Sequence, residues 1–283
     1  MNLNQLKNIL RECRIRPSRN LGQNFLVDGN VLDILIQSSD LSPEDNVLEI
    51  GPGLGILTEA LAARAGRVLA AEVDARLAAL TRNRLSECGN LEILTGDVLK
   101  NKNRLQPEVV TKLRSLEPFK LIANLPYAVA VPAILNLMKL PETDISMMVF
   151  TIQKEVGDRM LRDGQSGKSE YAGVAANTWG RVEWIKTLSP QVFYPRPRVD
   201  SCIIRITPQP DRLDRAVFGK FCSFVKKGFA MPRKTIANNL AGFLDRPAAL
   251  NALSEARIPP ENRPEDLSRT DWIRLFRQSS WRQ

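Results

Sequence analysis

Short apolar runs alternate with amphipathic segments of helical period over the first part of the chain. Runs such as 47–50 and 145–151 are mostly apolar, which is typical of strands buried on both faces. The same kind of run predicts further strands at 67–73, 91–95 and 119–123. Helical spacing predicts helices at 3–10, 31–37, 56–64, 75–85, 108–116, 131–139 and 153–161. Strands alternating with helices imply a parallel sheet with right-handed crossovers.

The pattern changes after a polar loop at 163–168. Two apolar runs at 182–188 and 201–207 predict closing strands, paired as an antiparallel hairpin at the edge of the sheet. The stiff, basic loop 193–198 lies between them. Pro208-Gln209-Pro210 marks a boundary, because only helical periodicity follows, at 215–230, 235–244, 247–256 and 271–278. The predicted fold class is α/β, a mostly parallel sheet with an antiparallel edge hairpin plus a small all-helical C-terminal domain. The predicted parts are residues 1–20, 21–207 and 208–283.

The amino-acid composition excludes several catalytic mechanisms and kinds of site. The 283 residues include no histidine, which excludes Ser-His-Asp and Cys-His catalysis and histidine acid–base chemistry. The four cysteines are far apart and form no C-x-x-C pair, so neither a zinc site nor a disulfide framework is expected. No apolar run approaches the roughly 20 residues that span a bilayer, and the N-terminus lacks the apolar centre of a secretory signal. We therefore expect a cytoplasmic protein, without a metal or a membrane partner.

Positive charge gathers at the two ends of the chain. The net charge is +9, of which residues 1–20 contribute +4 and residues 208–283 contribute +6, so the middle is close to neutral. A neutral body with basic ends indicates contact with a polyanion such as RNA. The predicted RNA-contacting residues are Arg11, Arg14, Arg16, Arg19, Arg196, Arg198, Lys226, Lys227, Arg233 and Lys234.

A glycine turn follows the first buried strand. Its spacing, Glu49-x-Gly51-x-Gly53-x-Gly55, departs from the G-x-G-x-x-G fingerprint of dinucleotide binding. It matches the E-x-G-x-G-x-G turn of S-adenosylmethionine-dependent methyltransferases, in which missing side chains let the backbone approach the ligand. Glu72 ends the second strand, where a carboxylate can accept hydrogen bonds from both ribose hydroxyls. Asp97 closes the third, where it can meet adenine.

Asn124-Leu125-Pro126-Tyr127 follows the strand at 119–123, and ligands bind at the carboxyl ends of such strands. An exocyclic adenine amine is a poor nucleophile because its lone pair is delocalised into the ring. The Asn124 side-chain carbonyl and the backbone carbonyl of Leu125 or Pro126 can accept its two N–H bonds, and Tyr127 can stack on the base. Catalysis then rests on positioning, which can supply roughly 7–11 kcal/mol of barrier lowering.

Together these pieces resemble the ribosomal RNA adenine N6-dimethyltransferase family. The matching segments are Leu21-Gly22-Gln23-Asn24-Phe25-Leu26, Glu49 to Gly55, Asn124 to Tyr127, Gln153-Lys154-Glu155-Val156, Phe193 to Ser201 and Arg233-Lys234-Thr235. The resemblance implies a Rossmann-like methyltransferase domain, and S-adenosylmethionine contacts from Asn24, Leu26, Gly51, Glu72, Asp97 and Asn124. The implied substrate is two adjacent adenines near the 3′ end of small-subunit (16S-type) ribosomal RNA, methylated on the immature subunit by a monomeric enzyme.

Two segments depart from the family pattern. Ala128 to Val131 replaces a polar residue, then Ile and Ser or Thr, and Ala172 to Ala175 replaces Gly-Arg-Leu-Ser. The first change removes polar groups beside the expected base pocket, and the second removes a basic contact. Three alternatives therefore remain: an inactive assembly or RNA-binding factor of the same fold, an adenine N6-methyltransferase acting on another RNA or on DNA, and a small-molecule methyltransferase.

Overall fold

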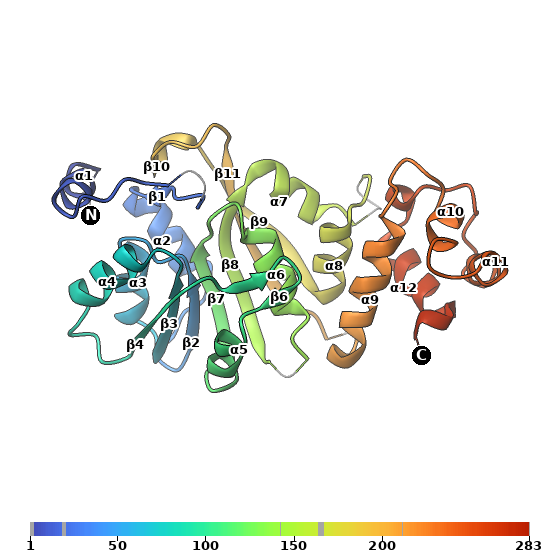
Figure 1. Ribbon diagram of the computed structural model, residues 1–283, viewed down its shortest axis with the longest axis horizontal. Helices are drawn as coiled ribbons and strands as arrows, with labels where there is room; N and C mark the ends of the chain where they lie inside the picture. The colour runs from blue at the N-terminus through green and yellow to red at the C-terminus, as the bar shows by residue number, and fades with distance from the viewer. Residues whose placement is uncertain (1–2, 19–20, 142, 164–166, 211, 283) are drawn as a thin grey trace. The chain divides into compact units, whose positions relative to one another are not determined.

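The computed structural model describes residues 3–18, 21–141, 143–163, 167–210 and 212–282 (Figure 1). The chain forms two compact units. The first consists of Met1–Leu137, Glu142–Gly157 and Glu183–Thr207. The second consists of Met138–Pro141, Asp158–Val182 and Pro208–Gln283, so it includes segments of the chain that precede residue 208.

A seven-stranded sheet is the centre of the first unit (Figure 1). Its strands, in spatial order, are β4 (Leu91–Thr95), β3 (Arg67–Glu72), β2 (Asn46–Ile50), β7 (Phe119–Asn124), β8 (Ile145–Gln153), β11 (Ser201–Pro208) and β9 (Gly180–Leu188). The pairs from β4 to β8 are parallel, and β11 runs antiparallel to β8. The prediction of a mostly parallel sheet is confirmed. The two closing strands are neighbours at one end of it, with β11 on the inner side.

The order of the strands places a switch point beside β2. The chain leaves β2 for β3 and β4, then returns to β7 on the other side of β2. Ligands bind outside the carboxyl ends of the strands at such a point, because the connections there diverge and leave a crevice. The glycine turn follows β2 and the Asn124 turn follows β7, so the sheet brings these two motifs to one crevice.

Helices connect the strands of the first unit much as the periodicity predicts. Asp28 caps one of them, because its carboxylate accepts hydrogen bonds from the backbone N–H groups of Asn30 and Val31. A small hairpin, β5 (Leu99–Asn101) with β6 (Arg104–Leu105), was not predicted, since strands of two and three residues carry no periodic signal. The helices are α1 (Leu3–Glu12), α2 (Gly29–Gln37), α3 (Ile56–Ala62), α4 (Ala75–Arg84), α5 (Pro107–Arg114), α6 (Ala130–Met138) and α7 (Lys154–Leu161). From Asp158 onward, the residues of α7 belong to the second unit.

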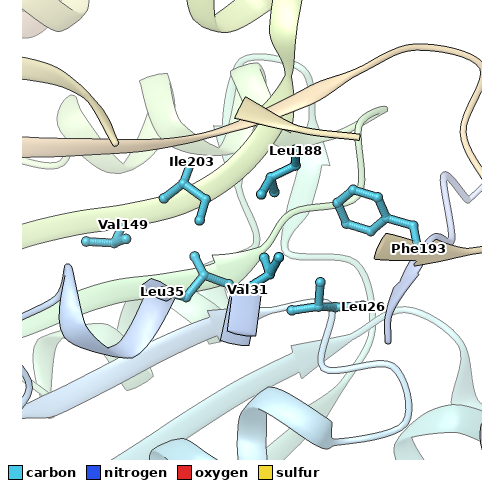
Figure 2. Packing of buried hydrophobic residues seen from close by; sticks show 7 residues of the cluster. All are labelled: Leu26, Val31, Leu35, Val149, Leu188, Phe193 and Ile203. Atoms are coloured by element: carbon cyan, nitrogen blue, oxygen red, sulfur yellow. The ribbon is translucent and has the colours of Figure 1, made fainter. Parts of the chain in front are cut away.

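Two short strands far apart in the sequence pair next to the crevice. β1 (Phe25–Leu26) runs antiparallel to β10 (Phe193–Tyr194), which follows the short helix η1 (Pro190–Val192). Figure 2 shows the apolar cluster that holds them, in which side chains from both strands converge with residues of α2, β8, β9 and β11. The sequence predicted an irregular stretch and a loop here. The pairing fixes the loop after β10 close to Asn24.

The N-terminal helix α1 packs on the same region. Its Leu6 and Leu10 belong to a buried cluster with Phe25, Leu54 and Leu77. The Lys7 ammonium lies 5.3 Å from the centre of the Tyr194 ring. The described part of the basic N-terminal segment is therefore folded against the first unit.

The second unit has an aromatic core. The rings of Phe221, Phe224 and Phe276 pack edge to face with centroids 5.5–5.6 Å apart, and Trp272 stacks on Phe229 at 5.2 Å. The helices of this unit are α8 (Tyr171–Trp179), α9 (Arg215–Gly228), α10 (Ile236–Leu240), α11 (Arg246–Glu255), η2 (Pro264–Asp266), α12 (Arg269–Gln278) and η3 (Ser280–Arg282).

Helix α8 is absent from the sequence-based prediction. Most of its residues are buried, including Gly173 and Trp179, so it has no polar face to mark a period. A Cβ at position 173 would lie within 2.5 Å of the carbonyl oxygens of Arg159 and Arg162. The departure from the family pattern at 172–175 therefore lies in tightly packed helix, where the structure has no room for a side chain at Gly173.

Candidate cofactor and substrate site

A cavity lies at the carboxyl ends of β2, β3 and β7. It is lined by Asn24 and Leu26, by the turn from Gly51 to Leu54, by Glu72, and by Asn124 to Tyr127. The structure thus brings together most of the predicted cofactor-binding residues and all four predicted catalytic residues. They come from four stretches of sequence that meet only in the folded chain.

The glycine turn is held directly against the Asn124 turn. Gly51 has φ +76°, and a Cβ there would lie 2.8 Å from Cγ of Pro126. Gly53 has φ +59°, and its Cβ would lie 2.9 Å from the Phe25 ring. Both positions need glycine for its left-handed backbone and for its missing side chain. The sequence predicted only the approach of a ligand as the reason.

Glu72 ties the second strand to the glycine turn. Its side chain is 4% exposed, and its two oxygens accept hydrogen bonds from the backbone N–H groups of Gly53 and Asp74, both at 2.9 Å. Burial raises the pKa of Glu72. Each carboxylate oxygen has a second lone pair, so the oriented group can still accept hydrogen bonds from a ligand's hydroxyls.

Two predicted cofactor residues lie outside the cavity lining. Asp97 is exposed, and its Oδ1 accepts a hydrogen bond from the backbone N–H of Leu99 at 2.8 Å. It follows Gly96, whose N–H donates to the Glu72 carbonyl oxygen, so it lies near the end of β3 that carries Glu72. Gly55 caps α3 with φ +76° and faces Thr81, where a Cβ would come within 2.7 Å of Cγ2. Gly55 therefore packs against α4, which carries Thr81, and does not face the cavity.

Glu49 is a buried carboxyl group in the cavity wall. It is 2% exposed, and its Oε2 has no hydrogen-bond partner among the described residues. Burial raises the pKa of Glu49 to about 8, and the nearby charge of Glu72 adds to the rise. The side chain is therefore protonated at neutral pH, and a cation bound in the cavity would favour its ionised form.

The raised pKa of Glu49 predicts a pH-dependent stability. Because the folded state holds the proton more tightly than the unfolded state, this contribution is full below the unfolded pKa near 4.5 and is lost as the pH rises through about 8. Glu49→Gln should remove the loss, so the variant should melt at a higher temperature than the wild type at pH 8 and above. Melting curves of the ligand-free protein between about pH 5 and about pH 9 measure this. Glu44→Gln, at an exposed position, is the matched control. Parallel pH profiles for wild type and Glu49→Gln would contradict the assignment.

The Asn124 amide is oriented by two hydrogen bonds. Its Nδ2 donates to the carbonyl oxygen of Asn24 at 2.9 Å, and its Oδ1 accepts from the Thr151 hydroxyl at 2.5 Å. A backbone carbonyl can only accept, so the first contact decides which end of the amide carries the oxygen. The Pro126 carbonyl already accepts from the N–H groups of Val129 and Ala130, both at 3.1 Å. Of the two backbone carbonyls that the sequence left open, that of Leu125 is therefore the better acceptor for a substrate.

Tyr127 lines this cavity and a second one. Its hydroxyl lies 2.5 Å from the Ser201 hydroxyl, and burial raises the pKa of the phenol. The second cavity shares Asn24 and Tyr127 with the first, and its other walls include Ala128 and the loop after β10. The departure from the family pattern at Ala128 therefore lies in the wall of the second cavity.

The structure divides the predicted RNA-contacting residues into three groups. Arg196 and Arg198 are exposed and line the second cavity. Arg11, Arg14 and Arg16 are exposed at the end of α1 and just after it, whereas Arg19 lies outside the described residues. The remaining residues are exposed in the second unit, where the Lys227 ammonium lies over the rings of Phe243 and Trp281; this group is Lys226, Lys227, Arg233 and Lys234.

Sequence reasoning did not single out one side chain of the cavity or an exposed apolar one next to Glu72. Gln23 lines both cavities, and its buried Nε2 has no partner among the described residues. Val73 follows Glu72 and is 44% exposed, so it offers an apolar surface beside the carboxylate. Gln23 belongs to the stretch 21–26 that resembles the family, but that resemblance implied ligand contacts only from Asn24 and Leu26. An apolar residue after a strand, such as Val73, is common and carried no signal.

Two further observations concern metal ligands and membrane-spanning helices. Within the described ranges, no group of three or more His, Cys, Asp or Glu side chains is placed to hold a metal ion. In that same part of the chain, no helix has both the length and the apolar character needed to cross a membrane.

A glycine turn and an Asn-Leu-Pro-Tyr turn that meet at the switch point of such a sheet define a Rossmann-like methyltransferase. A family model described as ribosomal RNA adenine dimethylase matches residues 15–280. The chain belongs to the ribosomal RNA adenine dimethylase family.

The similarity to individual relatives supports membership of this family. The chain is 38% identical to the ribosomal RNA small subunit methyltransferase A of Halothermothrix orenii, covering 92% of this chain and 87% of the relative. It is 37% identical to the protein of that name from Pelotomaculum thermopropionicum, covering 95% and 94%. Among solved structures, the 23S rRNA methyltransferase ErmE is 27% identical, with a TM-score of 0.64 over 90% of this chain and 99% of ErmE. A dimethyladenosine transferase from Plasmodium falciparum shares the fold at 24% identity, with a TM-score of 0.70 over 89% and 96%.

Proposed function

We propose that this protein transfers methyl groups from S-adenosylmethionine to N6 of two adjacent adenines near the 3′ end of small-subunit ribosomal RNA. The observation that carries the proposal is the Asn124 amide, whose Oδ1 is fixed in a cavity beside the glycine turn. The two curated relatives described above bear a small-subunit name, which supports this RNA over the large-subunit alternative.

The residues of the first cavity fit S-adenosylmethionine. Two polar atoms of its walls, Glu49 Oε2 and Gln23 Nε2, have no partner among the described residues. Glu72 would hold the ribose hydroxyls, Val73 would pack on the adenine, and Glu49 would balance positive charge. When bound, the cofactor supplies a methyl group on a sulfonium centre. Asp97, near the end of β3, would contact the adenine edge.

The residues around Asn124 would prepare the nucleophile. Asn124 Oδ1 and the Leu125 carbonyl would accept the two N–H bonds of the adenine amine, which favours a pyramidal nitrogen and frees its lone pair. Tyr127, held by Ser201, would stack on the base in the second cavity. Arg196 and Arg198 would meet the flanking phosphates, and the other basic clusters would add to binding. The step needs positioning and electrostatics, and no histidine takes part.

The proposal is tested by incubating the protein and labelled S-adenosylmethionine with small subunits that lack the modification. We expect label in N6,N6-dimethyladenine at two adjacent positions, identified by nucleoside mass spectrometry and by mapping the labelled fragment. Mature large subunits and duplex DNA serve as competing substrates. Label only in those substrates would support the alternative target, and binding to the small subunit without any label would support the inactive assembly factor.

A further inference from the structure

Thr151 makes the closest side-chain contact to the amide of Asn124. It is the cross-strand partner of Asn124 in the parallel pair of β7 and β8, and its hydroxyl lies 2.5 Å from Oδ1. Because Nδ2 of Asn124 is committed to the Asn24 carbonyl, Oδ1 faces Thr151, and the hydroxyl must be the donor. Thr151 is 0% exposed, and its other strand partner, Ile203, is equally buried. Water cannot replace the hydroxyl from that side.

The two methyl transfers place different demands on Asn124. In each transfer the N6 lone pair forms the new C–N bond, the sulfur keeps the electron pair of the broken S–C bond, and one N6 proton passes to solvent. An unmodified amine brings two N–H donors, one for Oδ1 and one for the Leu125 carbonyl. A monomethylated amine brings one, so a methyl group must face one of the two acceptors in the second transfer.

We propose that Thr151 is a positioning residue that enables the second methylation, because its hydroxyl keeps Asn124 Oδ1 hydrogen-bonded when a methyl group takes the place of an N–H. The Leu125 carbonyl, which accepts no hydrogen bond within the described residues, keeps the remaining N–H. A buried acceptor left without a partner is costly, and the Thr151 hydroxyl removes that cost from the second step. The inference rests on the proposed adenine N6 dimethylation.

The test compares Thr151→Val with Thr151→Ser. Valine keeps the β-branched shape in a buried strand but removes the donor, whereas serine keeps the donor. Time courses on unmodified small subunits give the rates of the first and second transfers from the amounts of monomethyl- and dimethyladenine. For Thr151→Val we expect the ratio of the second rate to the first to fall about tenfold, equivalent to about 1.4 kcal/mol, with accumulation of monomethyladenine. Thr151→Ser should restore the wild-type ratio.

A binding measurement gives a readout independent of turnover. With S-adenosylhomocysteine present, Thr151→Val should lose affinity for an RNA that carries N6-methyladenine at the target, relative to the unmodified RNA. The wild type should show a smaller difference in affinity between the methylated and the unmodified RNA. An unchanged ratio of rates in Thr151→Val, or an equal fall in both rates, overturns the inference while dimethylation by the wild type stands. A wild type that makes no methyladenine overturns the proposed function, and this inference with it.

Discussion

Replacing Asn124 by alanine is expected to lower the rate of methyl transfer about a hundredfold to a thousandfold. The substitution removes the side-chain oxygen that would accept an N–H of the adenine amine. It also leaves the Asn24 carbonyl and the Thr151 hydroxyl without their partner, each at a cost of about 1–3 kcal/mol in a buried setting. Single-turnover methylation of small subunits measures the rate, and calorimetric titration with S-adenosylmethionine shows how far cofactor binding also falls.

Asn90 provides the matched control for this experiment. Its amide donates to the carbonyl oxygens of Ala62 and Ala65, both at 2.9 Å, so it too makes two hydrogen bonds in the first unit. It precedes β4, at the end of the sheet opposite the cavity. Asn90→Ala should lose stability and keep its methylation rate at a temperature where it is folded. If Asn124→Ala retained more than about a tenth of the wild-type rate, the amide would not be the group that prepares the nucleophile.

Replacing Gly51 by alanine is expected to weaken S-adenosylmethionine binding at least about a hundredfold and to destabilise the fold by about 2–4 kcal/mol. At φ +76° an alanine is strained, and its Cβ would lie 2.8 Å from the Pro126 ring. Relief of that contact must move either the glycine turn or the Asn124 turn, and both are walls of the cavity. Calorimetric titration and thermal melting measure the two effects.

Gly29→Ala separates strain at the turn from the general effect of a new methyl group. Gly29 begins α2, has no positive φ, and a Cβ there would meet nothing within 4 Å. This variant should match the wild type in cofactor affinity and stability. A Gly51→Ala protein with wild-type affinity would show that the two turns do not need their close contact.

Much of the first unit could be predicted from local patterns. Mostly apolar runs identified β2, β7 and β8, because strands covered on both faces bury nearly every side chain. The helices between them carry one apolar face and were found by their period. Helix α8 was missed for the same physical reason, since burial on all sides leaves no periodic signal.

Some residues of the candidate site could likewise be predicted from the sequence, and others could not. The glycine turn and the Asn124 turn are contiguous motifs whose residue types reflect their chemistry, so the sequence indicates them directly. Asp97 was predicted from its place after the third strand and Gly55 from the spacing of the glycine turn, yet neither lines the cavity. The Asp97 carboxylate accepts from the Leu99 N–H, and Gly55 packs against Thr81 where α3 begins. Thr151 carries no local signal, since its role arises from Asn124, a neighbour distant in the sequence.

By itself the sequence determined the fold class, the family resemblance and the residues of both turns, because short-range periodicity and motif spacing are local properties of the chain. Only the tertiary structure decided that β1 pairs with β10, that Gly51 abuts Pro126, and that Asn124 is held between Asn24 and Thr151. Each of these contacts joins segments brought together by strand order and side-chain packing. The orientation of the amide, on which the chemistry depends, is therefore a property of the folded chain.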